Sequence, residues 1–108
     1  MQIHDAKDVQ YLLRKTGEAK LNPNQRIVVM LYASSSQRPD GTVETQATEL
    51  AKTAGMTPPV LSRTRRELVD AGWLEPTQKF GRVQVYRLVP GIFADRGLAG
   101  RHLRAVSG

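Results

Sequence analysis

Residues 49–73 limit the possible folds more than any other part of this 108-residue chain. The pattern up to Gly55 is typical of a short helix that ends where a left-handed residue lets the chain turn sharply. Thr57 and Pro58 then combine a capping side chain with a proline suited to a first helical turn. The segment therefore predicts two short helices joined by a glycine turn.

The second of these helices has two chemically different faces. Leu61 and Leu68, together with Val60, recur at helical spacing and are predicted to point inward. Charged residues are common on any solvated helix, but the first two turns of the opposite face hold only positive or neutral groups, and Glu67 and Asp70 come later. A basic rod of this kind suits the major groove of DNA. At roughly 100° per residue, the outer face consists of Pro59, Ser62, Arg63, Arg66 and Asp70.

The charge of the chain is concentrated in the half that contains this helix. The formal net charge is +6, and residues 57–108 carry 9 basic and 4 acidic side chains, against 7 and 6 in residues 1–56. Eleven of the 16 basic residues are arginine, whose planar fork pairs with phosphate or guanine. The C-terminal half is therefore predicted to face a polyanion.

Composition also excludes several classes of protein. A chain of 108 residues has the size of one domain with a modest core. It has no cysteine, which excludes disulfides and thiolate metal sites and fits a reducing cytosol. The longest apolar run, residues 27–33, is too short for a membrane span, and the N-terminus lacks the apolar region of a secretion signal. We expect a cytoplasmic protein without membrane contact.

Two more helices are predicted before this segment. Residues 3–14 approximate an amphipathic helix that ends near Gly17, with an apolar face of Ile3, Val9, Leu12 and Leu13. This helix serves either dimerisation or coverage of the core. Asn22 followed by Pro23 and, three residues after the cap, by Gln25 has the pattern of a capping box. Residues 26–33 are apolar nearly all round and predict the central buried helix.

The remaining segments favour strands and a tail. Residues 42–45 predict a short strand, with Thr45 or Thr48 capping the helix that follows. Residues 73–78 and 83–88 predict a hairpin around a four-residue turn, with Lys79 and Arg82 at its tip. From Pro90 onward the chain is basic, with few apolar anchors, and holds either a short helix over residues 98–106 or a frayed end.

The order of these elements resembles the winged helix-turn-helix family, and residues 22–88 look like the DNA-binding core of MarR-like regulators. The resemblance implies an α+β fold in which a three-helix core and a β-hairpin wing occupy residues 22–89. An extra N-terminal helix within residues 1–21 and a C-terminal extension, residues 90–108, would flank that domain. The matching motifs are Glu49-Leu50-Ala51, Gly55-Met56-Thr57, Leu61-Ser62-Arg63, Arg66-Glu67-Leu68 and Ala71-Gly72-Trp73-Leu74.

The resemblance also implies which residues would contact double-stranded DNA. Thr57 would bind a phosphate, and Lys79 and Arg82 would reach the minor groove or its phosphates. Two prolines at the start of the helix depart from the polar residues usual in the family and reduce the donors there. The residues that would read bases are Pro58, Pro59, Ser62, Arg63 and Arg66, with the two arginines as the best candidates.

Several functions remain open at this stage. A homodimeric repressor is the first hypothesis, although the chain is short for the long flanking helices and effector pocket of full MarR-like proteins. The start of the domain is also similar to winged-helix domains of plasmid and phage replication initiators, and winged helices can serve as protein-interaction modules. His4 and His102 lie near opposite ends of the chain without a catalytic constellation or close histidine pair. We therefore expect no enzyme activity, metal or cofactor, and the pattern identifies no effector.

Overall fold

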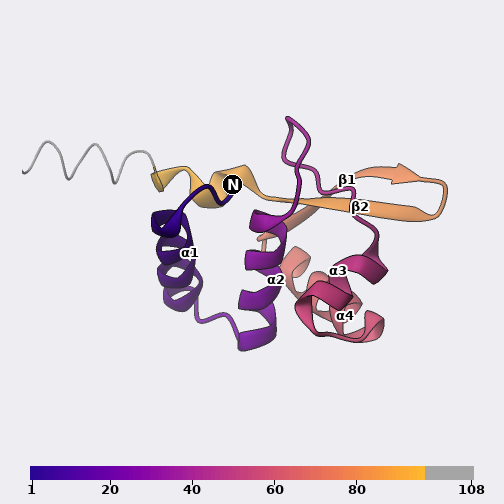
Figure 1. Cartoon of the computed structure of the whole chain (residues 1–108), viewed down its shortest axis with the longest axis horizontal. Coiled ribbons are helices and arrows are strands. Elements are labelled where there is room, and N and C mark those ends of the chain that lie inside the picture. The colour runs from indigo at the N-terminus through magenta and orange to yellow at the C-terminus, as the bar shows by residue number, and fades with distance from the viewer. Residues whose placement is uncertain (97–108) are drawn as a thin grey trace, which may run out of the picture.

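Four helices followed by an antiparallel hairpin form the described part of the computed structural model, residues 1–96. The hairpin leads into a short 3-10 turn, η1 (Figure 1). The helices are α1 (Ala6–Glu18), α2 (Pro23–Ser34), α3 (Ala47–Ala54) and α4 (Pro58–Asp70), the strands are β1 (Leu74–Phe80) and β2 (Val83–Leu88), and η1 spans Pro90–Phe93.

The starts of two helices follow the predicted caps. At α2 the backbone N–H of Gln25 donates to Asn22 Oδ1 at 2.9 Å, and the N–H of Asn22 donates to Gln25 Oε1 at 3.0 Å, which is the capping box. At α4 the hydroxyl of Thr57 accepts from the N–H of Val60 at 3.4 Å. The predicted cap of α3 is wrong: that helix begins after Gln46, whose side chain makes no capping bond. Thr45 and Thr48 both lie outside the cap position.

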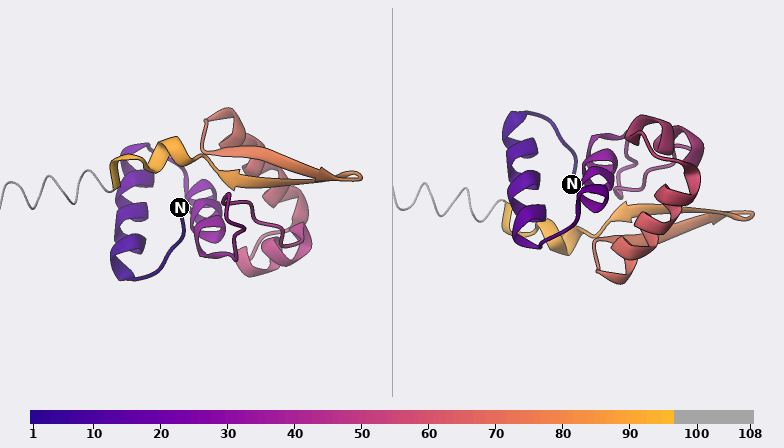
Figure 2. Two further views of the ribbon diagram at one scale, coloured as in Figure 1. Left: turned by 90° about the horizontal axis from the view of Figure 1, so that it is seen from above. Right: turned by 90° about the horizontal axis from the view of Figure 1, so that it is seen from below.

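The core surrounds α2, as the sequence predicted. Val28, Val29 and Ala33 are fully buried, and α1, α3, α4 and β2 all pack against this helix (Figure 2). The predicted apolar face of α1 needs correction, because Leu13 is 47% exposed. The buried side of α1 consists of Leu12, as predicted, together with Asp8 and Thr16, each four residues apart.

The hairpin is longer and its turn is tighter than predicted. Lys79 pairs with Gln84 and Phe80 pairs with Val83, so the strands continue to a two-residue turn. Gly81 opens that turn at φ 62°, which only glycine adopts freely. Because Lys79 is still paired with the opposite strand, it lies on β1 rather than at the tip.

The predicted strand at residues 42–45 is reduced to a single bridge. The N–H of Val43 donates to the carbonyl of Tyr86 at 3.0 Å. The chain then turns toward Gln46, after which α3 begins, so it cannot extend the ladder.

Residues 90–96 pack against α1, which the sequence did not predict. Phe93 is only 8% exposed, with its ring centroid 5.9 Å from Trp73 and 6.4 Å from Tyr11. Asp95 accepts from the Tyr11 hydroxyl at 2.6 Å and from Lys15 Nζ at 2.8 Å, and these two contacts lower the pKa of its carboxyl. The expectation of few apolar anchors is therefore wrong for this segment. The helix predicted at residues 98–106 lies outside the described residues.

An ion pair completes this contact. The guanidinium of Arg96 donates to the carboxylate of Asp8, whose side chain is 6% exposed. The backbone N–H of His4 donates to the same carboxylate at 2.8 Å, and together with Arg96 it holds the pKa of Asp8 below its ordinary value, although burial acts in the opposite direction. The start of the C-terminal segment is thus attached to α1 by apolar and ionic contacts.

Candidate nucleic-acid interface

The turn between α3 and α4 has the predicted left-handed glycine. Gly55 lies at φ 69° and ψ 29°, and its N–H donates to the carbonyl of Lys52 at 3.1 Å. The next N–H, from Met56, donates to the carbonyl of Ala51 at 2.9 Å. These bonds satisfy carbonyls at the end of α3 that have no partner within the helix. Ala51 is 1% exposed, so a small side chain stands at the buried side of α3.

The structure confirms the predicted separation of the two faces of α4. Leu61 and Leu68 are fully buried, and Thr64 between them is 2% exposed, with its hydroxyl donating to the carbonyl of Val60 at 2.8 Å. Val60 itself is half-buried. The outer face is exposed at every predicted position, which are Pro59, Ser62, Arg63, Arg66 and Asp70.

The two arginines on this face are more exposed than the neighbouring acid Glu67, which contacts α2. Glu67 is half-buried, and its Oε1 accepts from the side-chain amide of Gln25 at 3.1 Å. Within residues 1–96, Arg63 and Arg66 take part in no ion pair. The first two turns of α4 therefore present guanidinium groups that are available to an external anion.

The hairpin provides a second basic surface beside α4. It projects beyond the helices in a direction away from α1 (Figure 1). Lys79 on β1 and Arg82 in the turn are both exposed, and the strands are tied together where Gln84 Nε2 donates to the carbonyl of Gln78 at 2.7 Å. The exposed Thr57 and Pro58 lie at the start of α4. The eight predicted contact residues are thus distributed over α4, its cap and the hairpin.

Comparison with solved structures identifies this arrangement. The chain is similar to a MarR family regulator from Neisseria meningitidis, with 14% identity, a TM-score of 0.51 and coverage of 84% of this chain. The fold is a winged helix-turn-helix. The match spans 63% of the length of that regulator. No protein-family model and no curated protein matches the sequence.

Two other winged-helix structures are similar at slightly lower scores. The adhesin competence repressor AdcR from Streptococcus pyogenes has 20% identity and a TM-score of 0.48, over 94% of this chain and 73% of the repressor. The homodimeric DNA-binding domain of a possible ArsR-family transcriptional regulator from Mycobacterium bovis has 18% identity and a TM-score of 0.49, over 97% and 90% of the two chains.

Arg65 is a feature of the winged helix that sequence reasoning missed. Its guanidinium lies over the ring of Tyr86 in the wing, with its carbon 5.0 Å from the ring centroid, and its buried Nε has no hydrogen-bond partner among residues 1–96. Burial raises the pKa of the neighbouring Tyr32, and Arg65 offsets part of that shift. Helical spacing places Arg65 at the edge of the buried face of α4, and this position was the one signal in the sequence that could have identified it. Its partner is 21 positions further along the chain, so the contact was not predictable.

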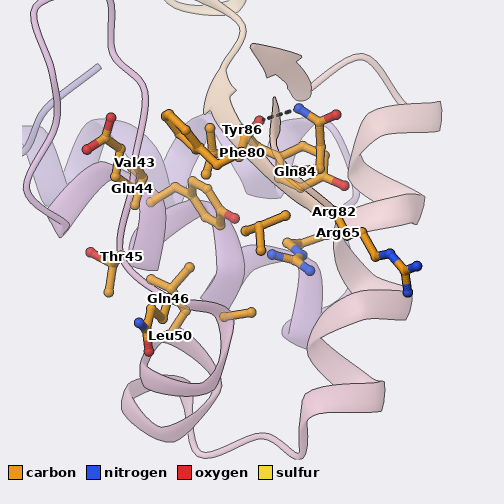
Figure 3. Close-up of a pocket in the computed structure, with 14 residues that line it drawn as sticks. Val43, Glu44, Thr45, Gln46, Leu50, Arg65, Phe80, Arg82, Gln84 and Tyr86 are labelled. Atoms are coloured by element: carbon orange, nitrogen blue, oxygen red, sulfur yellow. Dashed lines mark hydrogen bonds between the residues drawn. The ribbon is translucent and has the colours of Figure 1, made fainter. Parts of the chain in front are cut away.

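A cleft of about 320 Å³ opens beside this pair (Figure 3). We call it the wing cleft, because it lies between the start of α3, Arg65 and the wing. Its lining includes the apolar residues Leu50, Val43 and Tyr86, and Arg82 belongs to its lining as well as to the basic surface of the wing.

Residues 1–96 lack the features of two other classes of site. No helix in this range is long and apolar enough to cross a membrane. No group of three or more His, Asp or Glu side chains in the same range is arranged to hold a metal ion.

Proposed function

We propose that the protein is a sequence-specific DNA-binding regulator that acts in the cytoplasm as a homodimeric repressor, with α4 in the major groove of double-stranded DNA. The observation that carries this proposal is the outer face of α4, where Arg63 and Arg66 are exposed and Glu67 is engaged by α2. An arginine that binds guanine with both arms of its fork is the commonest specific contact between proteins and DNA. The winged-helix fold supports the same assignment, since it is the fold of a MarR family regulator.

The proposed contacts divide between base reading and positioning. Arg63 and Arg66 would read base edges, while Thr57 would bind a phosphate at the start of α4. Lys79 and Arg82 would contact the minor groove or its phosphates. The full set of proposed contact residues is exposed, as this role requires, and consists of Thr57, Pro58, Pro59, Ser62, Arg63, Arg66, Lys79 and Arg82.

The proposed domain organisation assigns the dimer contact to the opposite end of the molecule. Residues 22–89 would form the DNA-binding domain, residues 1–21 the dimerisation element, and residues 90–108 a basic extension. The position of α1 supports this arrangement, because α1 lies on the far side of α2 from α3 and α4 (Figure 2). A two-fold dimer would place its helices in successive major grooves, with half-sites about 34 Å apart. A monomer that binds a single half-site in solution would overturn the dimer.

Binding to defined DNA at two salt concentrations tests the function. The purified chain would be titrated with duplexes from the region upstream of its own gene and with random duplex, at about 50 and 200 mM salt. A complex that forms on one duplex and survives the higher salt is the expected result. Salt-sensitive binding to every duplex would indicate an architectural protein, and absence of binding would favour a protein-interaction module. An origin-derived site in place of a promoter site would indicate replication or partition control.

Substitutions separate base reading from phosphate contact. Arg63→Ala should cost about 1–3 kcal/mol and relax the preference at one base position, because it removes a specific contact. Lys79→Ala should weaken binding to all sequences alike and flatten the salt dependence. Arg14→Ala is the matched control, since Arg14 is an exposed arginine on α1. Equal, sequence-independent losses for Arg63→Ala and Lys79→Ala would mean that Arg63 contacts only phosphate.

A further inference from the structure

We propose that Phe80 and Val83 form an apolar wedge at the end of the wing, and that this wedge enters the minor groove, partly unstacks one base step and bends the DNA. The inference rests on the proposed DNA-binding function and adds to it two residues that influence which DNA is bound. We call Phe80 and Val83 the wing wedge.

The wing wedge is an apolar surface on an otherwise polar hairpin end. Phe80 is 52% exposed and Val83 is 60% exposed, the highest values among the large hydrophobic side chains of residues 1–96. The two residues are paired directly opposite each other in the ladder, so their side chains adjoin on the same side of the hairpin. An exposed apolar surface with a polar rim is typical of a contact with a partner.

The charges around the wing wedge favour DNA as that partner. Lys79 precedes Phe80 and Arg82 precedes Val83, and both cations are exposed. Neither takes part in an ion pair within residues 1–96. Residues 76–87 contain no acid. Phosphates on the two sides of a groove would therefore attract the cations while the apolar pair between them leaves water.

The wing wedge is too small to hold a protein partner. A stable protein interface buries about 800 Å² on each side, whereas a phenylalanine that becomes completely covered buries only about 150–250 Å². Insertion into DNA needs no wider surface, because minor-groove proteins kink the duplex with individual apolar side chains such as phenylalanine or leucine.

The width of the wing requires that the groove opens. The wing projects beyond the helices, and its two-residue turn follows directly after Phe80 (Figure 1). Its strands are about 4.8 Å apart before any side chain is counted, and the minor groove of B-DNA is only about 6 Å wide. The end of the wing therefore fits where the groove is widened. A side chain inserted from the minor groove kinks the duplex toward the major groove and provides that width.

Contacts behind the wing wedge hold it in position. Gln84 Nε2 donates to the carbonyl of Gln78 at 2.7 Å, which ties the two strands together next to the wedge. Closer to the helices, the guanidinium of Arg65 lies over the ring of Tyr86, with its carbon 5.0 Å from the ring centroid. These contacts reduce the ordering that binding would otherwise require. Binding of α4 in the major groove would therefore help the wing to unstack a base step.

An inserted wedge produces a sequence preference without hydrogen bonds to bases. Steps from pyrimidine to purine, such as TA, unstack and kink more easily than other steps. We therefore expect a TA or CA step under the wing. Its replacement by GG should weaken binding about fivefold or more, which is the lower end of the cost of one unfavourable base pair.

Energy transfer between dyes at the two ends of a duplex tests the bend. The duplex is one that the full chain selects from a randomised pool, and 2-aminopurine placed at successive positions reports unstacking by a rise in fluorescence. We expect a bend of about 20–90° and a rise at one step in each half-site. A bound duplex that stays straight, without a rise at any step, would overturn the wing wedge.

Variants assign the bend to the wing wedge. Phe80→Thr removes the ring but keeps a β-prone residue, and it should abolish the bend, the 2-aminopurine signal and the preference for TA. Phe80→Leu keeps an apolar side chain and should retain most of all three. Ile27→Thr is the matched control, because Ile27 is 43% exposed on α2 and is not a proposed contact residue.

A full bend with folded Phe80→Thr would refute the assignment. If circular dichroism shows that this variant does not fold, the 2-aminopurine signal with the wild-type chain carries the test. Lys79→Ala separates charge from insertion: it should weaken binding but leave the bend unchanged once the duplex is saturated.

The outcomes distinguish this inference from the proposed function. If the chain binds a duplex and leaves it straight, the wing wedge is wrong and the DNA-binding function stands. If it binds no duplex, both are wrong. Sedimentation with vesicles of phosphatidylcholine and phosphatidylserine tests the other surface that suits an apolar and cationic tip. Vesicle binding that requires Phe80, combined with straight DNA, would assign the tip to a membrane surface and overturn the wing wedge.

Discussion

Replacement of Gly55 by alanine tests the turn that sets the direction of α4. Gly55 lies at φ 69°, and a Cβ added there would meet no atom of the described part of the chain within 4 Å, so the cost comes from the backbone alone. The left-handed conformation costs an L-residue roughly 1–2 kcal/mol. Alanine also restricts the unfolded chain, which offsets about 0.4–1 kcal/mol. The free energy of unfolding should therefore fall by about 1 kcal/mol, which lowers Tm by about 4–8 °C in a domain of this size.

Urea and thermal unfolding followed by the fluorescence of Trp73 would measure this change. Trp73 is 5% exposed in the core and is the single tryptophan of the chain. Gly91→Ala is the matched control, because Gly91 has no positive φ and its added Cβ also meets no atom of residues 1–96 within 4 Å. It should be neutral or slightly stabilising. Gly55→Asn should cost less than Gly55→Ala, since asparagine tolerates the left-handed region better.

The difference in stability between the two alanine variants tests whether Gly55 is held in the left-handed region. If Gly55→Ala is as stable as Gly91→Ala, the backbone at Gly55 is not held in the left-handed region, and the account of the turn is refuted. A loss well above about 2 kcal/mol would also contradict it, because backbone strain alone does not reach that size.

Two further predictions concern the attachment of residues 90–96 to α1. Phe93→Ala should lower the free energy of unfolding by about 3 kcal/mol in urea titrations, because Phe93 fills a buried position beside Trp73. Phe93→Leu should lower it by clearly less. If the alanine variant is as stable as the wild type, the segment is not packed against the core. The pKa of Asp8 is lowered from 3.8, so the contribution of its carboxylate to folding stability is complete above that pH. This contribution is lost as the pH falls through the lower pKa of the folded state. Asp8→Asn should therefore be destabilised at neutral pH and differ less from wild type near about pH 2, and a constant difference across that range would contradict the ion pair with Arg96.

Local signals predicted the helix boundaries where cap and partner are neighbours. Asn22 and Gln25 are three residues apart, as are Thr57 and Val60, so the sequence contains both halves of each contact. The same reasoning failed for α3, where two threonines are near the boundary and neither caps it. A side chain that is able to cap does so only if the packing of the helix places it at the correct position.

The prediction of the wing was limited in a similar way. Alternating β-prone residues around Gly81 predicted a hairpin, but the number of turn residues depends on how far the strands continue to pair. That extent is set by the ladder as a whole, including Lys79 opposite Gln84. The sequence alone therefore placed Lys79 at the tip, whereas pairing places it on β1.

The candidate site was likewise predicted only in part from the sequence. Helical periodicity predicted the exposed Arg63 and Arg66, because a helix of known start fixes the direction of every side chain along it. It did not predict the contact between Arg65 and Tyr86, or the wing cleft, because those bring α4, α3 and the wing together.

The sequence by itself determined the two caps, the left-handed glycine, the hairpin and the outer face of α4, since each follows from residues within a few positions of one another. Only the tertiary structure decided that Phe93 is buried beside Trp73, that Asp8 pairs with Arg96, and that Arg65 lies over Tyr86. The physical reason is that such contacts join residues separated by 20 to 88 positions. No local pattern records which distant side chain will fill a given space, because that depends on how all the elements pack together.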